Sequence, residues 1–192
     1  MRTKGSWKMR LGIAMFALGM LGIGVPRTSA AEKSVVSRSS QNTDLSKQVG
    51  HQLRMVPWYG VFDDLGYSVN GTEVTLTGAV VNPATKSDAV GYVKHIKGVT
   101  SVVNNIKVLP PSSMDFRIRR AEYRSIFGYA GLYRYAMGAN PSIHIVVDTG
   151  HVTLVGYVSN QTDRQLAYMR ADAVPGVFSV TNNLQIAGTQ TM

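Results

Sequence analysis

A gapless internal repeat constrains the fold of this chain more than any other feature. Residues 74–108, VTLTGAVVNPATKSDAVGYVKHIKGVTSVVNNIKV, align with residues 152–186, VTLVGYVSNQTDRQLAYMRADAVPGVFSVTNNLQI, at an offset of 78 residues, and 13 of the 35 aligned positions are identical. Two long copies do not make a solenoid, which needs three or more short repeats to bury a core. We therefore predict a duplicated domain.

Each copy shows the same succession of helix and strand patterns. The residues that set the first helical period are Leu45, Val49 and Leu53 in copy one and Phe116, Tyr123 and Phe127 in copy two. Two alternating strands joined by a turn, a second helix and a last strand, expected at 99–108 and 177–186, follow. Because the strands are apolar on one face, that face should carry the helices. The expected fold is α+β, with two tandem αββαβ domains, each a three-stranded sheet with two helices on one face.

Glycines and asparagines recur at matching positions of the two copies. Gly78 and Gly156 lie inside strands, where glycine marks a close approach of another group, and we expect a helix to pack over each. Gly98 and Gly176 are expected to end helices. The repeat positions to which we assign structural roles are Gly78, Gly156, Gly98, Gly176, Asn104, Asn105, Asn182 and Asn183.

The N-terminal residues show the three-part pattern of a secretory signal peptide. Basic residues precede an uncharged apolar stretch at 11–25, and Ser29-Ala30-Ala31 supplies small residues for cleavage. The apolar stretch is shorter than the roughly 20 residues that span a bilayer. We therefore predict a signal peptide over 1–31, cleaved after Ala31, and a periplasmic or secreted protein. An uncleaved N-terminal anchor is the alternative.

Two polar segments divide the rest of the chain. The first is rich in serine and lacks apolar periodicity, which favours a flexible linker. The second contains Pro110-Pro111, which disfavours regular structure. The expected boundaries are a linker at 32–43, a first domain at 44–109, a linker at 110–114, a second domain at 115–187 and a tail at 188–192.

Charge, cysteine content and missing motifs exclude several classes of protein. The formal net charge is +9, but residues 1–31 hold five basic residues and no acidic one, so the rest carries +4. This small excess, together with secretion, argues against nucleic acid as a partner. The absence of cysteine excludes disulfides, thiolate metal sites and a cysteine nucleophile. Because no hydrolase, zinc-protease or P-loop motif occurs, we expect no enzyme activity, no metal or other cofactor and no small-molecule substrate.

The repeated pattern resembles a known bacterial family. A strand of the form VTLxGxV, then a helix, then GVxSVxNN and an apolar strand resembles the BON domain, which is named after bacterial osmotically induced and nodulation-associated proteins. A secretory signal followed by two such copies resembles the osmotically induced periplasmic members. The resemblance covers about residues 44–187. It implies a non-catalytic envelope module that binds phospholipid surfaces or acts in envelope maintenance, stress protection or protein quality control.

A basic and aromatic cluster is the strongest candidate for a contact surface. Its residues are Arg117, Arg119, Arg120 and Arg124 on the expected helix and Tyr129 and Tyr133 after it. Arginine beside tyrosine suits an anionic membrane interface, where arginine contacts phosphate and tyrosine lies at headgroup depth. We therefore expect an anionic phospholipid surface or envelope proteins as partners. A core-facing aromatic stripe beside a solvated basic face is the alternative.

Two other functions stay open. Uncovered sheet faces and edges suit a chaperone-like module that binds unfolded or apolar protein segments. A small hydrolase or metal-dependent enzyme has weaker support. His144, His151 and Asp148 could hold a metal ion weakly, although we expect exposed structural histidines instead. Asp63-Asp64, the acidic pair, is expected to lie in a solvated loop.

Overall fold

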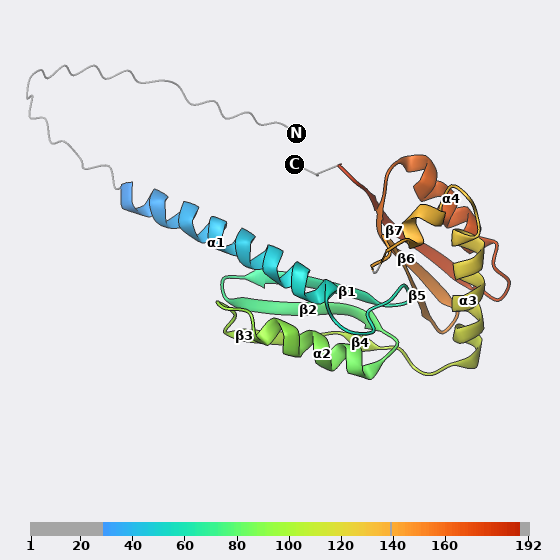
Figure 1. The fold of residues 1–192 in the computed structure, drawn as a ribbon, viewed down its shortest axis with the longest axis horizontal. Helices are drawn as coiled ribbons and strands as arrows, with labels where there is room; N and C mark the ends of the chain where they lie inside the picture. The colour runs from blue at the N-terminus through green and yellow to red at the C-terminus, as the bar shows by residue number, and fades with distance from the viewer. Residues whose placement is uncertain (1–28, 139, 189–192) are drawn as a thin grey trace, which may run out of the picture.

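The computed structural model describes residues 29–138 and 140–188 and shows an α+β fold built twice (Figure 1). The first domain consists of α1 (Ser29–Arg54), β1 (Asp64–Asn70), β2 (Glu73–Val80), α2 (Pro83–Lys94), β3 (Ser101–Asn104) and β4 (Lys107–Val108). The second consists of α3 (Ser113–Phe127), the 3-10 helix η1 (Tyr133–Ala136), β5 (Ile143–Asp148), β6 (His151–Val158), α4 (Gln161–Asp172) and β7 (Ser179–Ile186). Most of the expected signal peptide and tail lies outside the described residues.

In each sheet the central strand has an antiparallel and a parallel neighbour. β2 pairs antiparallel with β1 and parallel with β3 and β4. β6 pairs antiparallel with β5 and parallel with β7. A parallel return needs a long crossover connection, which α2 and α4 provide. The two helices of each domain contact each other and the sheet, so the predicted tandem αββαβ arrangement is confirmed.

Each domain buries one hydrophobic core between its helices and its sheet. The buried positions at four-residue spacing on the first helices are Leu45, Val49 and Leu53 in α1 and Ile118, Glu122 and Ile126 in α3. A fully buried aliphatic side chain contributes about 1.5–3 kcal/mol through the hydrophobic effect. Glu122 therefore stands in the second core where Val49 stands in the first, and it cannot supply that contribution as a charged group.

The repeated strand glycines are required by the neighbouring main chain. Gly78 and Gly156 have φ angles of +107° and +118°. A Cβ atom would lie 2.2 Å from the carbonyl oxygen of Asp64 at Gly78 and 2.1 Å from that of Ser142 at Gly156. The expectation that a helix packs over these glycines is wrong, because the close group is the backbone where the adjoining strand begins.

Local structure differs from expectation in two further places. Residues 32–43, expected as a flexible linker, belong to α1, which runs from Ser29 to Arg54. The segment contains neither proline nor glycine before Gly50, so nothing in it interrupts a helix. The expected strand 99–108 is divided into β3 and β4, with residues 105 and 106 between them. α3 begins at Ser113, inside the expected linker 110–114.

The segment that precedes β1 joins the two domains. The Ile145 amide on β5 donates to the Val61 carbonyl at 2.7 Å. His144 Nδ1 donates to the Gly60 carbonyl at 3.1 Å, and the His144 ring stacks on Tyr59 with 5.1 Å between ring centroids. Lys107 of β4 forms an ion pair with Asp148 of β5. The first domain therefore closes part of the outer edge of β5, which would otherwise present unpaired backbone groups.

Candidate functional site

Three arginines form an exposed cationic face on α3. Arg117, Arg120 and Arg124 are exposed and lie three and four residues apart, which places them on one side of the helix. Within residues 29–138 and 140–188, the ion pairs are Lys107–Asp148 and Arg134–Asp163. The three arginines therefore carry positive charge that no neighbouring carboxylate neutralises.

An apolar hollow lies beside this cationic face, and we call it the α3 groove. Its lining residues are Met114, Phe116, Arg117, Ile118, Arg120, Ala121, Arg124, Pro175 and Gly176, and its volume is about 650 Å³. Phe116 is 57% exposed, and the Arg120 guanidinium lies 5.9 Å from the centre of its ring. The groove combines apolar surface with a cationic rim, as an interface for anionic amphiphiles requires.

The first turn of α3 fixes which face of the helix points outward. Ser112 caps the helix by accepting from the Asp115 amide at 3.1 Å. The Asp115 carboxylate accepts from the amides of Thr149 at 3.0 Å and Gly150 at 2.8 Å, in the turn between β5 and β6. This attachment directs Ile118 into the core and leaves Arg117 on the opposite, exposed side.

Arg119 does not belong to the exposed surface expected for it. Only 5% of the residue is exposed, and its Nη2 donates to the Val147 carbonyl of β5 at 2.7 Å. Burial lowers the pKa of the guanidinium, and the carboxylates of Asp115, Asp63 and Asp148 oppose that shift at longer range. Arg119 follows Ile118 on the inward face, so the expected group of four surface arginines contains three.

The expected aromatic residues are divided between core and surface. Phe127 is buried, whereas Phe116 and Tyr123 are exposed, so neither a core-facing nor an exposed stripe describes them all. Tyr129 and Tyr133 are exposed, but they follow the end of α3 and do not line the α3 groove. Arg170 of α4 lies 5.5 Å from the centre of the Tyr129 ring.

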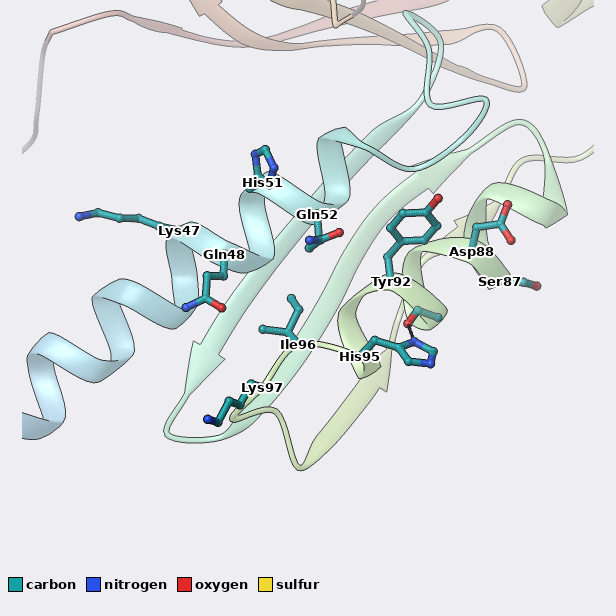
Figure 2. A pocket seen from close by; sticks show the side chains of 11 residues that line it. Lys47, Gln48, His51, Gln52, Ser87, Asp88, Tyr92, His95, Ile96 and Lys97 are labelled. Carbon is teal, nitrogen blue, oxygen red and sulfur yellow. Dashed lines mark hydrogen bonds between the residues drawn. The ribbon is translucent and has the colours of Figure 1, made fainter.

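The first domain has a hollow that corresponds to the α3 groove, but no group of three arginines lines it. It lies between α1 and α2, has a volume of about 820 Å³ and is shown in Figure 2. Measured from the buried positions of each helix, Lys47 and His51 correspond to Arg120 and Arg124, and Asp44 corresponds to Arg117. In Figure 2, Lys47 extends away from α2 and does not bridge the hollow. The cationic face is therefore a property of the second copy.

The candidate metal and acid–base residues are engaged in structural contacts, although Asp148 and His151 face each other across β5 and β6. His144 is buried against Tyr59 and Gly60, not exposed as expected, and His151 Nδ1 lies 2.7 Å from Ser179 Oγ. Residues 29–138 and 140–188 contain no cluster of three or more His, Cys, Asp or Glu side chains arranged for a metal ion.

The acidic pair is not in a solvated loop. Asp63 is buried, and its carboxylate accepts from the amides of Val81 at 2.7 Å and Gly60 at 3.0 Å. Burial raises the pKa of Asp63 and of Asp64. The docking of the two domains, which local sequence patterns do not reveal, explains why His144 is buried, whereas the carboxylate of Asp63 is held by amides of its own domain.

Sequence reasoning missed Trp58 and Glu122. Trp58 is 78% exposed and has a φ angle of +65° in the segment between α1 and β1. Aligning the buried spacing of α3 with that of α1 would have placed Glu122 in the core.

Among the helices that the structure describes, none combines the length and the apolar character needed to cross a bilayer.

Comparison with known proteins gives one family and one curated relative. Residues 41–110 and 134–188 match the family model of the BON domain. Osmotically-inducible protein Y of Escherichia coli strain K12 is 34% identical over 133 residues, which cover 64% of this chain and 61% of that protein. The chain therefore matches less than two thirds of the length of this relative.

Solved structures give only weak likenesses. CdsD, a structural protein of the Type III secretion system of Chlamydia trachomatis, has a TM-score of 0.27 and 15% identity, with 76% of this chain and 94% of that chain covered. Its C-terminal domain has a TM-score of 0.26 and 15% identity, with 71% and 96% covered. Likenesses at these TM-scores carry no argument about fold or function.

Proposed function

Because this chain belongs to the family of BON-domain proteins, we propose that it is a non-catalytic protein of the bacterial envelope that binds anionic phospholipid surfaces. The α3 groove is the contact surface, and Arg117, Arg120 and Arg124 are the residues that meet phosphate groups. The observation that carries this proposal is the placement of three unneutralised arginines beside the exposed ring of Phe116. The expected periplasmic location and a role in osmotic stress rest on the N-terminal sequence pattern and on the name of the curated relative.

The charges and the aromatic ring are suited to work together. A cation close to an anionic bilayer contributes about 1 kcal/mol, so three contribute roughly 3 kcal/mol, or a factor of about 150 in affinity. This electrostatic attraction alone is weak. Insertion of Phe116 at headgroup depth adds apolar burial, as in other interfacial aromatic residues.

Vesicle binding tests the proposal directly. We expect the protein, purified after processing in its host, to co-sediment with vesicles of phosphatidylglycerol and phosphatidylcholine but not with vesicles of phosphatidylcholine alone. The triple variant Arg117→Gln, Arg120→Gln, Arg124→Gln should lose about 100-fold in affinity, because each arginine contributes about 1 kcal/mol at the surface. Raising the salt concentration should weaken binding of the unchanged protein, because salt screens exposed charges.

A charge-matched variant separates a specific surface from general attraction. Lys47→Gln, Lys94→Gln, Lys97→Gln removes three exposed cations from the first domain and should leave most of the binding intact. Equal losses in the two triple variants would contradict a contact surface on α3. Binding that does not depend on anionic lipid would contradict the phospholipid proposal itself.

A second candidate function is the binding of unfolded protein segments along β7. In the described residues this eight-residue strand pairs only with β6, so its other edge can accept an added strand. Suppression of client aggregation in the absence of vesicles, unchanged in the triple arginine variant, would favour this chaperone-like function over lipid binding.

A further inference from the structure

A second, smaller pocket lies where the two domains meet, and we call it the seam pocket. Its lining residues are Trp58, Gly60, Val61, Phe62, Asp63, Val81, Asn82, Phe116, Arg119 and Arg120, and its volume is about 370 Å³. The first domain supplies the segment before β1 and the link between β2 and α2, and the second supplies one face of α3. This volume is near the lower limit of small-molecule sites.

The walls of the seam pocket are mainly apolar side chains. Val61 and Phe62 are packed against the core of the second domain. Trp58, Val81 and Phe116 expose 78%, 40% and 57% of their surfaces and therefore present apolar area that the described residues leave uncovered. Exposed apolar side chains gathered around one hollow indicate a binding site.

Arg119 places a buried positive charge in this apolar surrounding. Its Nη2 is bonded to the Val147 carbonyl, but its buried Nε has no hydrogen-bond partner, and Arg119 forms no ion pair with any described residue. A buried charge without a counter-charge is costly, and an anion placed nearby recovers part of that cost.

The nearby carboxylates do not take the place of that anion. Asp63 is engaged by the backbone amides of Gly60 and Val81. Asp115 is engaged by the backbone amides of Thr149 and Gly150. Asp148 pairs with Lys107. They attract the Arg119 guanidinium only at longer range, and Arg120 adds a second positive charge to the pocket lining.

We propose that the seam pocket binds a small amphiphile with an aliphatic body and a single carboxylate, such as a medium-chain fatty acid. The carboxylate lies beside the guanidinium of Arg119 and neutralises its charge. The aliphatic body lies against Trp58, Val81 and Phe116. This site differs from the α3 groove in its buried charge, although the two hollows share Phe116 and Arg120.

Trp58 provides a reporter inside the site. The chain has two tryptophans, and Trp58 is the one within the described residues. Titration with decanoate, kept below its micelle concentration, should shift Trp58 emission to shorter wavelength as the ring leaves water. Decanol, which has the same body without the charge, should bind at least 10-fold more weakly. Trp58→Phe should abolish the spectral change.

Substitutions separate the buried charge from the exposed ones. Arg119→Met, which keeps an extended side chain without charge, should weaken decanoate binding at least 10-fold and bring it close to that of decanol. The matched change Lys94→Met, at an exposed cation of α2 outside both the seam pocket and the α3 groove, should leave decanoate affinity within about twofold. If Arg119→Met does not fold, Val81→Phe is the deciding variant, because it fills the pocket from the first domain and should also block decanoate.

Three results would overturn the proposal. These are equal affinities for decanoate and decanol, unchanged decanoate affinity in the variant that fills or neutralises the pocket, and absence of any Trp58 response. Each is independent of vesicle binding by the exposed arginines, so this site and the proposed lipid surface succeed or fail separately.

Discussion

Gly156→Ala is expected to lower the free energy of unfolding by about 3 kcal/mol or more. The new methyl group would require an alanine at a φ angle of +118° and would lie 2.1 Å from the Ser142 carbonyl oxygen. The unfavourable φ angle costs roughly 1–2 kcal/mol, and a forced shift of the adjoining backbone adds a cost of similar size. Gly78→Ala should behave in the same way in the first domain, where the distance is 2.2 Å. Urea unfolding followed by circular dichroism measures the loss.

Gly91→Ala is the matched control for this prediction. Gly91 lies in α2, its φ angle is not in the left-handed region, and an added Cβ atom meets nothing within 4 Å. Alanine there should stabilise the helix by about 0.5–1 kcal/mol. A loss at Gly156 no larger than the change at Gly91 would show that the adjoining backbone is not as close as described.

Glu122→Gln is expected to stabilise the protein by about 3 kcal/mol at pH 7. Glu122 is 0% exposed, and neither carboxylate oxygen has a hydrogen-bond partner among the described residues. Burial raises the pKa of its carboxyl group from 4.5 to about 8. Glutamine has nearly the same shape and cannot ionise, so folding of the variant at pH 7 does not have to bind the proton that an unfolded glutamate has released.

The raised pKa of Glu122 predicts that the stability of the folded protein decreases as the pH rises. A raised pKa in the folded state means that the folded protein keeps a proton that the unfolded chain releases. Stability is therefore fully present below pH 4.5 and is lost as the pH rises towards 8, at up to about 1.4 kcal/mol for each pH unit. Unfolding at pH 5, 6, 7 and 8 should show a decline in the unchanged protein and a much flatter profile in Glu122→Gln.

A surface glutamate serves as the control for Glu122. Glu73 of β2 is exposed and accepts from Ser101 Oγ at 3.1 Å. Glu73→Gln should change stability by less than about 0.5 kcal/mol, as surface substitutions usually do. If the unchanged protein and Glu122→Gln show parallel pH profiles, the pKa of Glu122 is not raised by folding.

The fold could be predicted well from the repeat because each helix and strand pattern occurs twice, at matching positions of the two copies. The helix orientation in the second copy was harder to predict, since Glu122 interrupts the apolar spacing and Phe116, Tyr123 and Phe127 offer a competing period. An inward face defined by these aromatic residues places Arg119 on the surface. The spacing of Leu45, Val49 and Leu53 in copy one, transferred to α3, indicates the face that is in fact buried.

Contacts between the domains account for the other errors. Asp63 and His144 belong to stretches that look exposed when each copy is considered alone. His144 is buried because residues 59–61 contact β5, which lies about 80 residues later in the chain, and Asp63 accepts from the Gly60 and Val81 amides of its own domain. No periodicity within one copy contains that information, so the seam pocket could not be predicted from the sequence.

The contact between the segment before β1 and strand β5 also affects how many domain copies could be joined in this way. The contact joins two unlike surfaces, the leading segment of one copy and the outer strand edge of the next. Head-to-tail contacts of this kind generate open arrays unless something ends them. In the second copy the corresponding connection contains η1, Tyr133–Ala136, instead of the Tyr59–Val61 stretch. The second copy therefore lacks the stretch through which the first copy contacts a neighbouring strand edge.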